Sequence, residues 1–178
     1  MKWALAIMTM FLIAGVSTEG QQNSKKSEAR DFAVEVLPVP ELPLNIHEAA
    51  LVKTAKGYVL KCRFSNSADA ALIGMRYSLT TIDPLTGARP LTNRIEGFEL
   101  AAFETKTLTF PTAIRFHPAD GSRLVLMLEQ VVSRDSIWEV IRAKDVLEAY
   151  VKGDYSVQPH VLRVANQVDA PMQTRVIY

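Results

Sequence analysis

In the stretch Tyr58-Val-Leu-Lys-Cys-Arg-Phe-Ser65, every second residue is apolar and the residues between them are mostly polar. This period of two is typical of a β-strand with one buried face. After a break at residues 66–69, a second alternation ends at Asp83-Pro84, and one of its faces carries Ile73, Met75, Tyr77 and Leu79. Two strands with one apolar face each are not stable alone in water, so other segments must form a second layer over them.

Length and charge narrow the class of protein. The chain has 178 residues, of which 48% are hydrophobic, and this suits one domain with its own core better than two. The formal net charge is +1, and Lys and Arg are scattered along the chain rather than gathered in runs. The sequence therefore predicts no nucleic-acid binding and no attraction to an anionic membrane surface.

Residues 1–20 resemble a secretory signal peptide. A short positive start at Met1-Lys2 precedes an apolar run from Trp3 to Val16, and small residues follow up to Gly20. The alternative is an uncleaved anchor, but the run is shorter than the roughly 20 residues that span a bilayer. No Cys directly follows the run, so a lipid anchor has no acceptor. We expect a secreted or periplasmic protein with no membrane span after cleavage.

Residues 21–44 form a predicted lead-in that is flexible at first and then rich in proline. Phe32, Val34 and Val36 alternate before the prolines at 38, 40 and 43. A proline has no N–H for a central ladder, so this segment is predicted as an edge strand, a polyproline-like stretch, or both in succession.

Residues 45–153 are the predicted sandwich domain. Beyond the two opening strands, we expect strands at 46–52, 95–100 (interrupted near Gly97), 105–110, 123–132 and 137–141, with turns at 54–57, 83–87 and 133–136. A short helix should follow, capped by Asp145 and ended by Gly153. The predicted core consists of Leu60, Cys62, Phe64, Met75, Tyr77, Leu108, Phe110, Leu124, Leu126, Leu128 and Trp138.

Residues 154–178 show no sustained period and contain two prolines, so we expect a mobile tail that is dispensable for folding. Two β-prone segments within it, residues 161–164 and 174–178, could add to an exposed sheet edge of this chain or of a partner. The alternative is that one of them completes the sandwich.

Short strands at roughly ten-residue intervals, joined by turns, predict an all-β antiparallel sandwich with one short C-terminal helix. The chain resembles the immunoglobulin-like and fibronectin type III-like domains of exported bacterial proteins over about residues 45–143. The resemblance rests on the strand from Tyr58 to Asn66, on the segment from Phe98 to Phe110 and on the hairpin from Arg123 to Ile141. Unlike an antibody-type domain, the chain has one Cys and carries its Trp on the last strand. The resemblance therefore implies the fold class and no particular function.

The residues that commonly carry chemistry form no recognisable site. Cys62 is the only cysteine, so no internal disulfide can form, and its alternation predicts a buried structural thiol. The sequence His47-Glu48-Ala-Ala-Leu51 begins like a zinc-protease motif but has Leu51 in place of the second histidine. His117 and His160 stand far apart, and the carboxylate pairs Asp83 with Glu96 and Glu99 with Glu104 fall on predicted loops or exposed faces.

We predict no catalytic, cofactor-binding or metal-ligating residue and no cofactor. The favoured function is a non-catalytic interaction or structural module of the cell envelope or extracellular space, with another exported protein as its partner. The alternative is an enzyme or enzyme subunit whose site is assembled from separate loops. A deep pocket with converging polar groups would favour that alternative. The sequence does not indicate the ligand or the oligomeric state.

Overall fold

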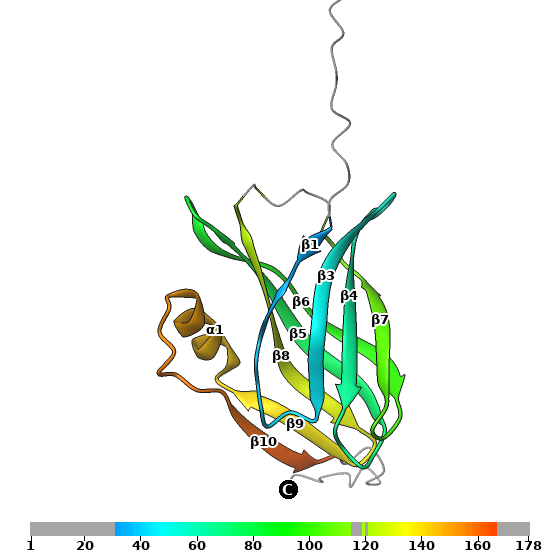
Figure 1. The fold of residues 1–178 in the computed structure, drawn as a ribbon. Coiled ribbons are helices and arrows are strands. Elements are labelled where there is room, and N and C mark those ends of the chain that lie inside the picture. The colour runs from blue at the N-terminus through cyan, green and yellow to red at the C-terminus, as the bar shows by residue number, and fades with distance from the viewer. Residues whose placement is uncertain (1–30, 115–118, 120, 167–178) are drawn as a thin grey trace, which may run out of the picture.

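Two β-sheets pack face to face in the computed structural model, which describes residues 31–114, 119 and 121–166 (Figure 1). The four-stranded sheet has the order β1-β3-β4-β7, where β1 is Phe32–Ala33, β3 Leu44–Thr54, β4 Gly57–Asn66 and β7 Thr105–Pro111. The larger sheet has the order β10-β9-β8-β5-β6, where β5 is Leu72–Asp83, β6 Gly87–Leu100, β8 Arg123–Ser133, β9 Ser136–Ile141 and β10 His160–Ala165. A short strand, β2 (Glu35–Leu37), joins this sheet by pairing with β8, and α1 (Ala143–Val151) follows β9.

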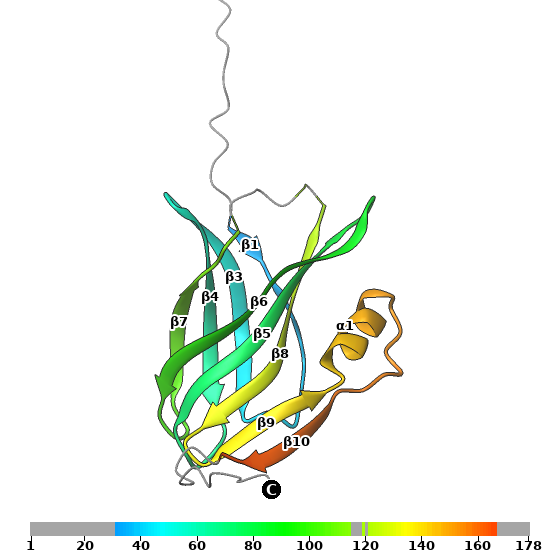
Figure 2. The ribbon, with the colours of Figure 1, turned by 180° about the vertical axis from the view of Figure 1, so that it is seen from behind.

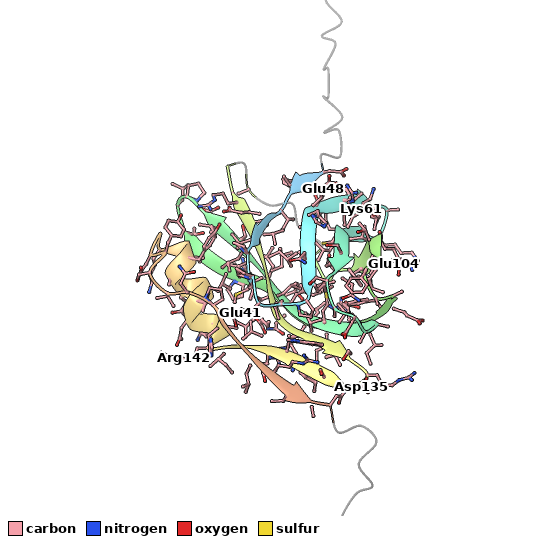
Figure 3. The ribbon with its side chains drawn as sticks, turned by 60° about the horizontal axis from the view of Figure 1, so that its bottom comes forward. Glu41, Glu48, Lys61, Glu104, Asp135 and Arg142 are labelled. Carbon is pink, nitrogen blue, oxygen red and sulfur yellow. The ribbon has the colours of Figure 1, made fainter. Side chains whose placement is uncertain are left out.

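Among the described residues, every pair of neighbouring strands is antiparallel except β2 with β8, so the predicted all-β antiparallel sandwich with one short helix is confirmed. Seen from behind, the larger sheet lies in front and α1 stands beside it, away from the four-stranded sheet (Figure 2). Charged side chains such as Glu48 and Lys61 project from the outside of β3 and β4 (Figure 3).

The core lies where the alternating faces of the two sheets meet. The predicted core residues are buried, apart from Leu108, which is partly buried and packs against the others. Phe64 on β4 has no exposed surface, and its ring centroid lies 6.2 Å from that of Phe98 and 6.0 Å from that of Phe110. These rings join both sheets, because Phe98 lies on β6 and Phe110 on β7. The alternation read from the sequence therefore assigns the correct face to β4.

Strand β8 is buried on both faces, as its continuous apolar run predicts. Leu124, Leu126 and Leu128 face the interior, while Val125 and Met127 point outward and are still buried. The outer face of the larger sheet is therefore covered at this strand, and α1 contributes to the cover, because its Val146 is buried in the same hydrophobic cluster.

The turn between β5 and β6 matches its sequence. The side-chain oxygen Oδ1 of Asp83 accepts hydrogen bonds from the backbone N–H groups of Leu85 and Thr86, at 2.8 and 2.9 Å. Gly87 has φ +82°, a conformation that residues with a Cβ rarely adopt. The predicted chain reversal is confirmed.

Two strand predictions were wrong in detail. The register between β5 and its neighbours shifts between Leu72 and Gly74, so Ile73 is 44% exposed and Leu72 takes the buried place instead. The strand predicted at 95–100 is not broken near Gly97, because β6 is continuous from Gly87 to Leu100, but its pairing is irregular there: Gly97 pairs with Gly74 and Leu100 with Leu72, so β6 carries one extra residue.

The lead-in belongs to the sandwich from Phe32 onward. Phe32 and Ala33 pair with β3, and residues 35–37 then pair with β8 in the other sheet, so this segment crosses between the sheets along their edge. The prolines follow in the connection to β3, as expected for an edge strand succeeded by an irregular stretch. Val34, Leu37, Leu42 and Leu44 are buried in the core. The sandwich therefore begins before residue 45.

The helix starts differently from the prediction. Asp145 is not the N-cap; Arg142 holds that position in the left-handed conformation, with φ 54°, and no side chain caps the helix. Asp145 lies in the first turn and pairs with Arg142 at 2.6 Å. At the other end, Gly153 has φ +76°, its N–H binds the carbonyl of Tyr150, and the N–H of Asp154 binds the carbonyl of Ala149. This is a Schellman motif, so Gly153 ends the helix as predicted.

The prediction of a mobile tail was wrong for residues 160–165. They form β10, which pairs with β9 along its whole length, from His160 opposite Ile141 to Ala165 opposite Ser136. The guanidinium of Arg163 lies 4.9 Å from the centroid of the Trp138 ring. The alternative that a tail segment completes the sandwich therefore holds for residues 161–164, while residues 174–178 lie outside the described residues.

Replacing Phe64 with Ala should cost about 3–5 kcal/mol of unfolding free energy, because it removes a fully buried ring from between two others. Urea denaturation of the purified variant measures this loss. Phe103→Ala is the matched control, since Phe103 is 71% exposed and should change stability little. A loss below about 1 kcal/mol for Phe64→Ala would contradict the assigned strand face.

Candidate functional site

The single cysteine is a packing residue. Cys62 is 1% exposed on β4, and burial raises the pKa of its thiol to about 12. A thiol held protonated at neutral pH is a poor nucleophile and a poor metal ligand.

The histidines do not converge within the described residues. His47 lies on β3, an extended strand, and its Nε2 is 2.8 Å from Oγ of Ser65, so the segment that begins like a zinc-protease motif is not helical. His160 begins β10, and its Nδ1 lies 4.0 Å from a carboxylate oxygen of Glu41. His117 lies outside the described residues. Among the residues that the structure describes, no three His, Cys, Asp or Glu side chains gather as a metal site would require.

Three of the four carboxylates that the sequence analysis paired have separate local partners, and the fourth, Glu99, is exposed on β6. Asp83 organises the β5–β6 turn, and Glu96 pairs with Arg94 at 3.1 Å. Glu104 accepts a hydrogen bond at 2.8 Å from the backbone N–H of Ala101. Each of these three carboxylates thus has its own backbone or arginine partner.

A cluster that the sequence did not reveal fastens α1 to the larger sheet. The hydroxyl of Tyr150 on α1 donates to Oε1 of Glu35 on β2, and Arg123 on β8 donates to Oε2 of the same carboxylate through Nε at 3.1 Å and Nη2 at 2.6 Å. The hydrogen bond to Glu35, aided by burial, raises the pKa of Tyr150 to about 12. The pKa of Glu35 is lowered, chiefly by the Tyr150 hydroxyl and then by Arg123. We call these three residues the helix tether.

A cleft of about 610 Å³ opens beside the tethered helix, between α1 and the outer face of β5 and β6. Ala143, Leu147 and Val151 stand four residues apart on α1 and form one wall. The opposite side and the floor come from two neighbouring strands and consist of Ser78, Thr80, Ala88, Pro90, Leu91, Thr92 and Asn93. Ser78 and Thr80 point outward because they alternate with the core residues Tyr77 and Leu79. We call this site the α1 cleft.

Some of the polar groups that line the α1 cleft are paired with one another. Glu129 on β8 lies 3.2 Å from Nε of Arg76, and both its carboxylate oxygens accept from Nδ2 of Asn93 at 3.0 Å. Ser78 is 8% exposed, and its hydroxyl has no hydrogen-bond partner among the described residues. Such a group is unfavourable when buried, unless a bound molecule or water pairs with it.

Charged side chains along the helix border the same cleft. Lys144, Glu148 and Lys152 form a second row with a spacing of four residues, next to the apolar row. Lys144 lies 3.8 Å from Glu148, and no ion pair of Lys152 is found within the described part of the chain. The α1 cleft thus combines an apolar helical wall, a mixed strand wall and a charged border, and small-molecule sites likewise combine apolar surface with a few polar groups.

No sequence motif could have located this cleft. Its lining comes from β5, β6, β8 and α1, and the contributing residues are ordinary small, apolar or charged types. The only signal was indirect: outward-facing apolar residues on β8 required a cover, and the predicted helix was available to supply it.

Comparisons with protein-family models, curated proteins and solved structures found no match to this chain. No catalytic family is therefore indicated, and the resemblance to immunoglobulin-like and fibronectin type III-like domains stays a prediction. Among the described residues, no helix combines the length and hydrophobicity needed to cross a membrane.

Removing the tether should loosen α1. Tyr150→Phe should lower the unfolding free energy by about 0.5–1.5 kcal/mol, the usual worth of one hydrogen bond, and amide hydrogen exchange along α1 should accelerate. Because the folded-state pKa of Glu35 is lowered, its contribution is present above the unfolded-state value near pH 4.5 and is lost as the pH falls through the folded-state value.

Measuring the free energy of unfolding as the pH is lowered tests the predicted contribution of Glu35. Glu35→Gln should remove part of the stability loss between about pH 5 and 3, whereas Glu48→Gln, a change at an exposed carboxylate on β3, should not. Unchanged exchange rates in Tyr150→Phe would show that the hydrophobic contacts of α1 hold the helix without the tether.

Proposed function

We propose that this protein is an exported, non-catalytic binding module of the cell envelope or extracellular space, and that the α1 cleft holds an apolar ligand. The observation that carries the proposal is the cleft itself. Its volume of about 610 Å³ falls within the roughly 300–1,000 Å³ of ligand sites. Its helical wall is apolar, and Pro90 and Leu91 add apolar surface on the opposite side.

The titratable groups support binding over proton transfer. The pKa values of Cys62, Tyr77 and Tyr150 are raised to about 12, chiefly by burial for the first two and by the Glu35 hydrogen bond for the third. The pKa values of Glu35 and Asp83 are lowered by hydrogen bonds to their carboxylates. Each shift favours the protonation state that the group already has at neutral pH. A general acid or base works best with the opposite arrangement, a pKa near the working pH.

Export is the part of the proposal that rests on residues 1–20, which lie outside the described residues. A positive start, an apolar run and small residues at its end are what the export machinery recognises. Expressed in a bacterium, the protein should leave the cytoplasm and lose its first residues, after Ser17 or Gly20. Intact-mass measurement of the exported protein checks this, and a mass that still includes Met1 to Val16 would contradict cleavage.

Ligand binding can be tested with an uncharged dye whose emission shifts in apolar surroundings, such as Nile red. The wild-type chain should bind it saturably at one site. Leu147→Asp should weaken binding roughly tenfold or more, because it places a charge in the apolar wall. Leu85→Asp is the matched control, since Leu85 is 94% exposed at the tip of the β5–β6 hairpin.

A second variant separates loss of the cleft from loss of the helix. Ala88→Trp changes an exposed residue of β6 on the opposite wall, so it should occupy the cleft while α1 stays folded. Circular dichroism melting checks that each variant is folded. Equal dye binding by the wild type, Leu147→Asp and Ala88→Trp would overturn the proposal.

A further inference from the structure

The α1 cleft is elongated. Its helical wall runs from Ala143 to Lys152, and ten helix positions extend over about 14 Å. Its strand wall runs from Ala88 to Asn93, and six strand positions extend over about 17–20 Å. A site of this shape suits a chain-like molecule better than a compact one.

The walls favour an aliphatic chain over a peptide. The backbone groups of α1 are bonded within the helix, and those of β5 pair with β6 and β8 on its two sides. Strand β6 is the edge strand of the described sheet, but its free backbone groups point along the plane of the sheet rather than out of the face that lines the cleft. A peptide in the cleft would therefore find few backbone partners for its own N–H and C=O groups, which are costly to bury unpaired. An aliphatic chain has no such groups and gains by contact with Leu147, Val151 and Leu91.

The charges at the border favour an acidic head group. At the floor, Arg76 and Asn93 already engage the carboxylate of Glu129. Along the helix, Glu148 lies near Lys144, and Lys152 remains as the lining cation with no ion pair found among the described residues. A negative group bound at this end of the cleft would therefore meet an available ammonium group.

Building on the proposed function, we infer that the α1 cleft binds a free long-chain carboxylate, with its chain along Leu147 and Val151 and its carboxylate at Lys152. An exposed ion pair contributes about 0.2–1 kcal/mol, which corresponds to an affinity gain of up to about fivefold over an uncharged head group. The apolar chain supplies the rest of the affinity.

Isothermal titration calorimetry with three probes of equal chain length tests the inference: dodecanoate, dodecanol and dodecylamine, each below its aggregation limit. The full wild-type chain should bind dodecanoate about two- to fivefold more tightly than dodecanol, and dodecylamine most weakly. In Lys152→Gln this preference should disappear while the affinity for dodecanol stays unchanged. Lys61→Gln, a change on the outer face of β4 (Figure 3), should keep the preference.

The possible failures are distinguishable. If dodecanol or dodecylamine binds as tightly as dodecanoate, or if Lys152→Gln keeps the preference, the inferred head group is wrong and the apolar cleft stands. If none of the three probes binds, the proposed function fails with it. Sedimentation with phosphatidylglycerol vesicles provides a further arm, because vesicle binding that Leu147→Asp abolishes would replace the free carboxylate with a membrane lipid.

Discussion

The structure depends on the burial of β8 on both faces. This strand pairs with β5 on one side and with β2 and then β9 on the other, so it lies at the middle of the larger sheet. Its inward residues meet the four-stranded sheet, but Val125 and Met127 point outward and are fully buried. Leaving two such side chains in water would cost about 1.5–3 kcal/mol each. The outer face therefore needs a cover at this strand, and α1 contributes to it.

Helix α1 is too small to cover the whole outer face of the larger sheet, and the uncovered part forms one side of the α1 cleft. With nine residues, α1 is about 14 Å long and about 10–12 Å across, whereas five strands spaced about 4.8 Å apart make a sheet about 20–24 Å wide. The tether holds the helix over β2 and β8, where Val146 is buried and Leu37 faces the same side as Val125 and Met127. The outer face of β5 and β6 remains beyond its reach, and the space between them is the α1 cleft. Ala88 on β6 is exposed, and a side chain this small loses little by the partial cover.

The alternation of apolar and polar residues made much of the sandwich predictable. The strand predictions that were wrong have physical reasons. Strands such as β4 and β8 bury whole faces, so hydrophobicity marks them clearly. Ile73 was assigned to the wrong face because a register shift interrupts the period of two without changing residue types. Residues 160–165 were missed as a strand because Leu162 and Val164 are 48% and 41% exposed at a sheet edge, where burial imposes no pattern. The cleft was beyond sequence reasoning altogether, since it exists only through the position of α1 relative to β6.

The position of α1 also couples the tether to the cleft. Tyr150 and Val146 face the sheet, while Leu147 and Val151, one position further along, face the cleft, so a movement of the helix changes both surfaces together. A ligand that fills the cleft adds apolar contacts to one side of α1 and must therefore stabilise its docked position. By reciprocity, anything that holds the helix in place raises the affinity of the cleft by the same free energy. The ion pair of Glu35 with Arg123 would take part in the proposed binding in this way, although neither residue lines the cleft: it orients the carboxylate that accepts from Tyr150 and so helps to hold the helix wall carrying Leu147 in place.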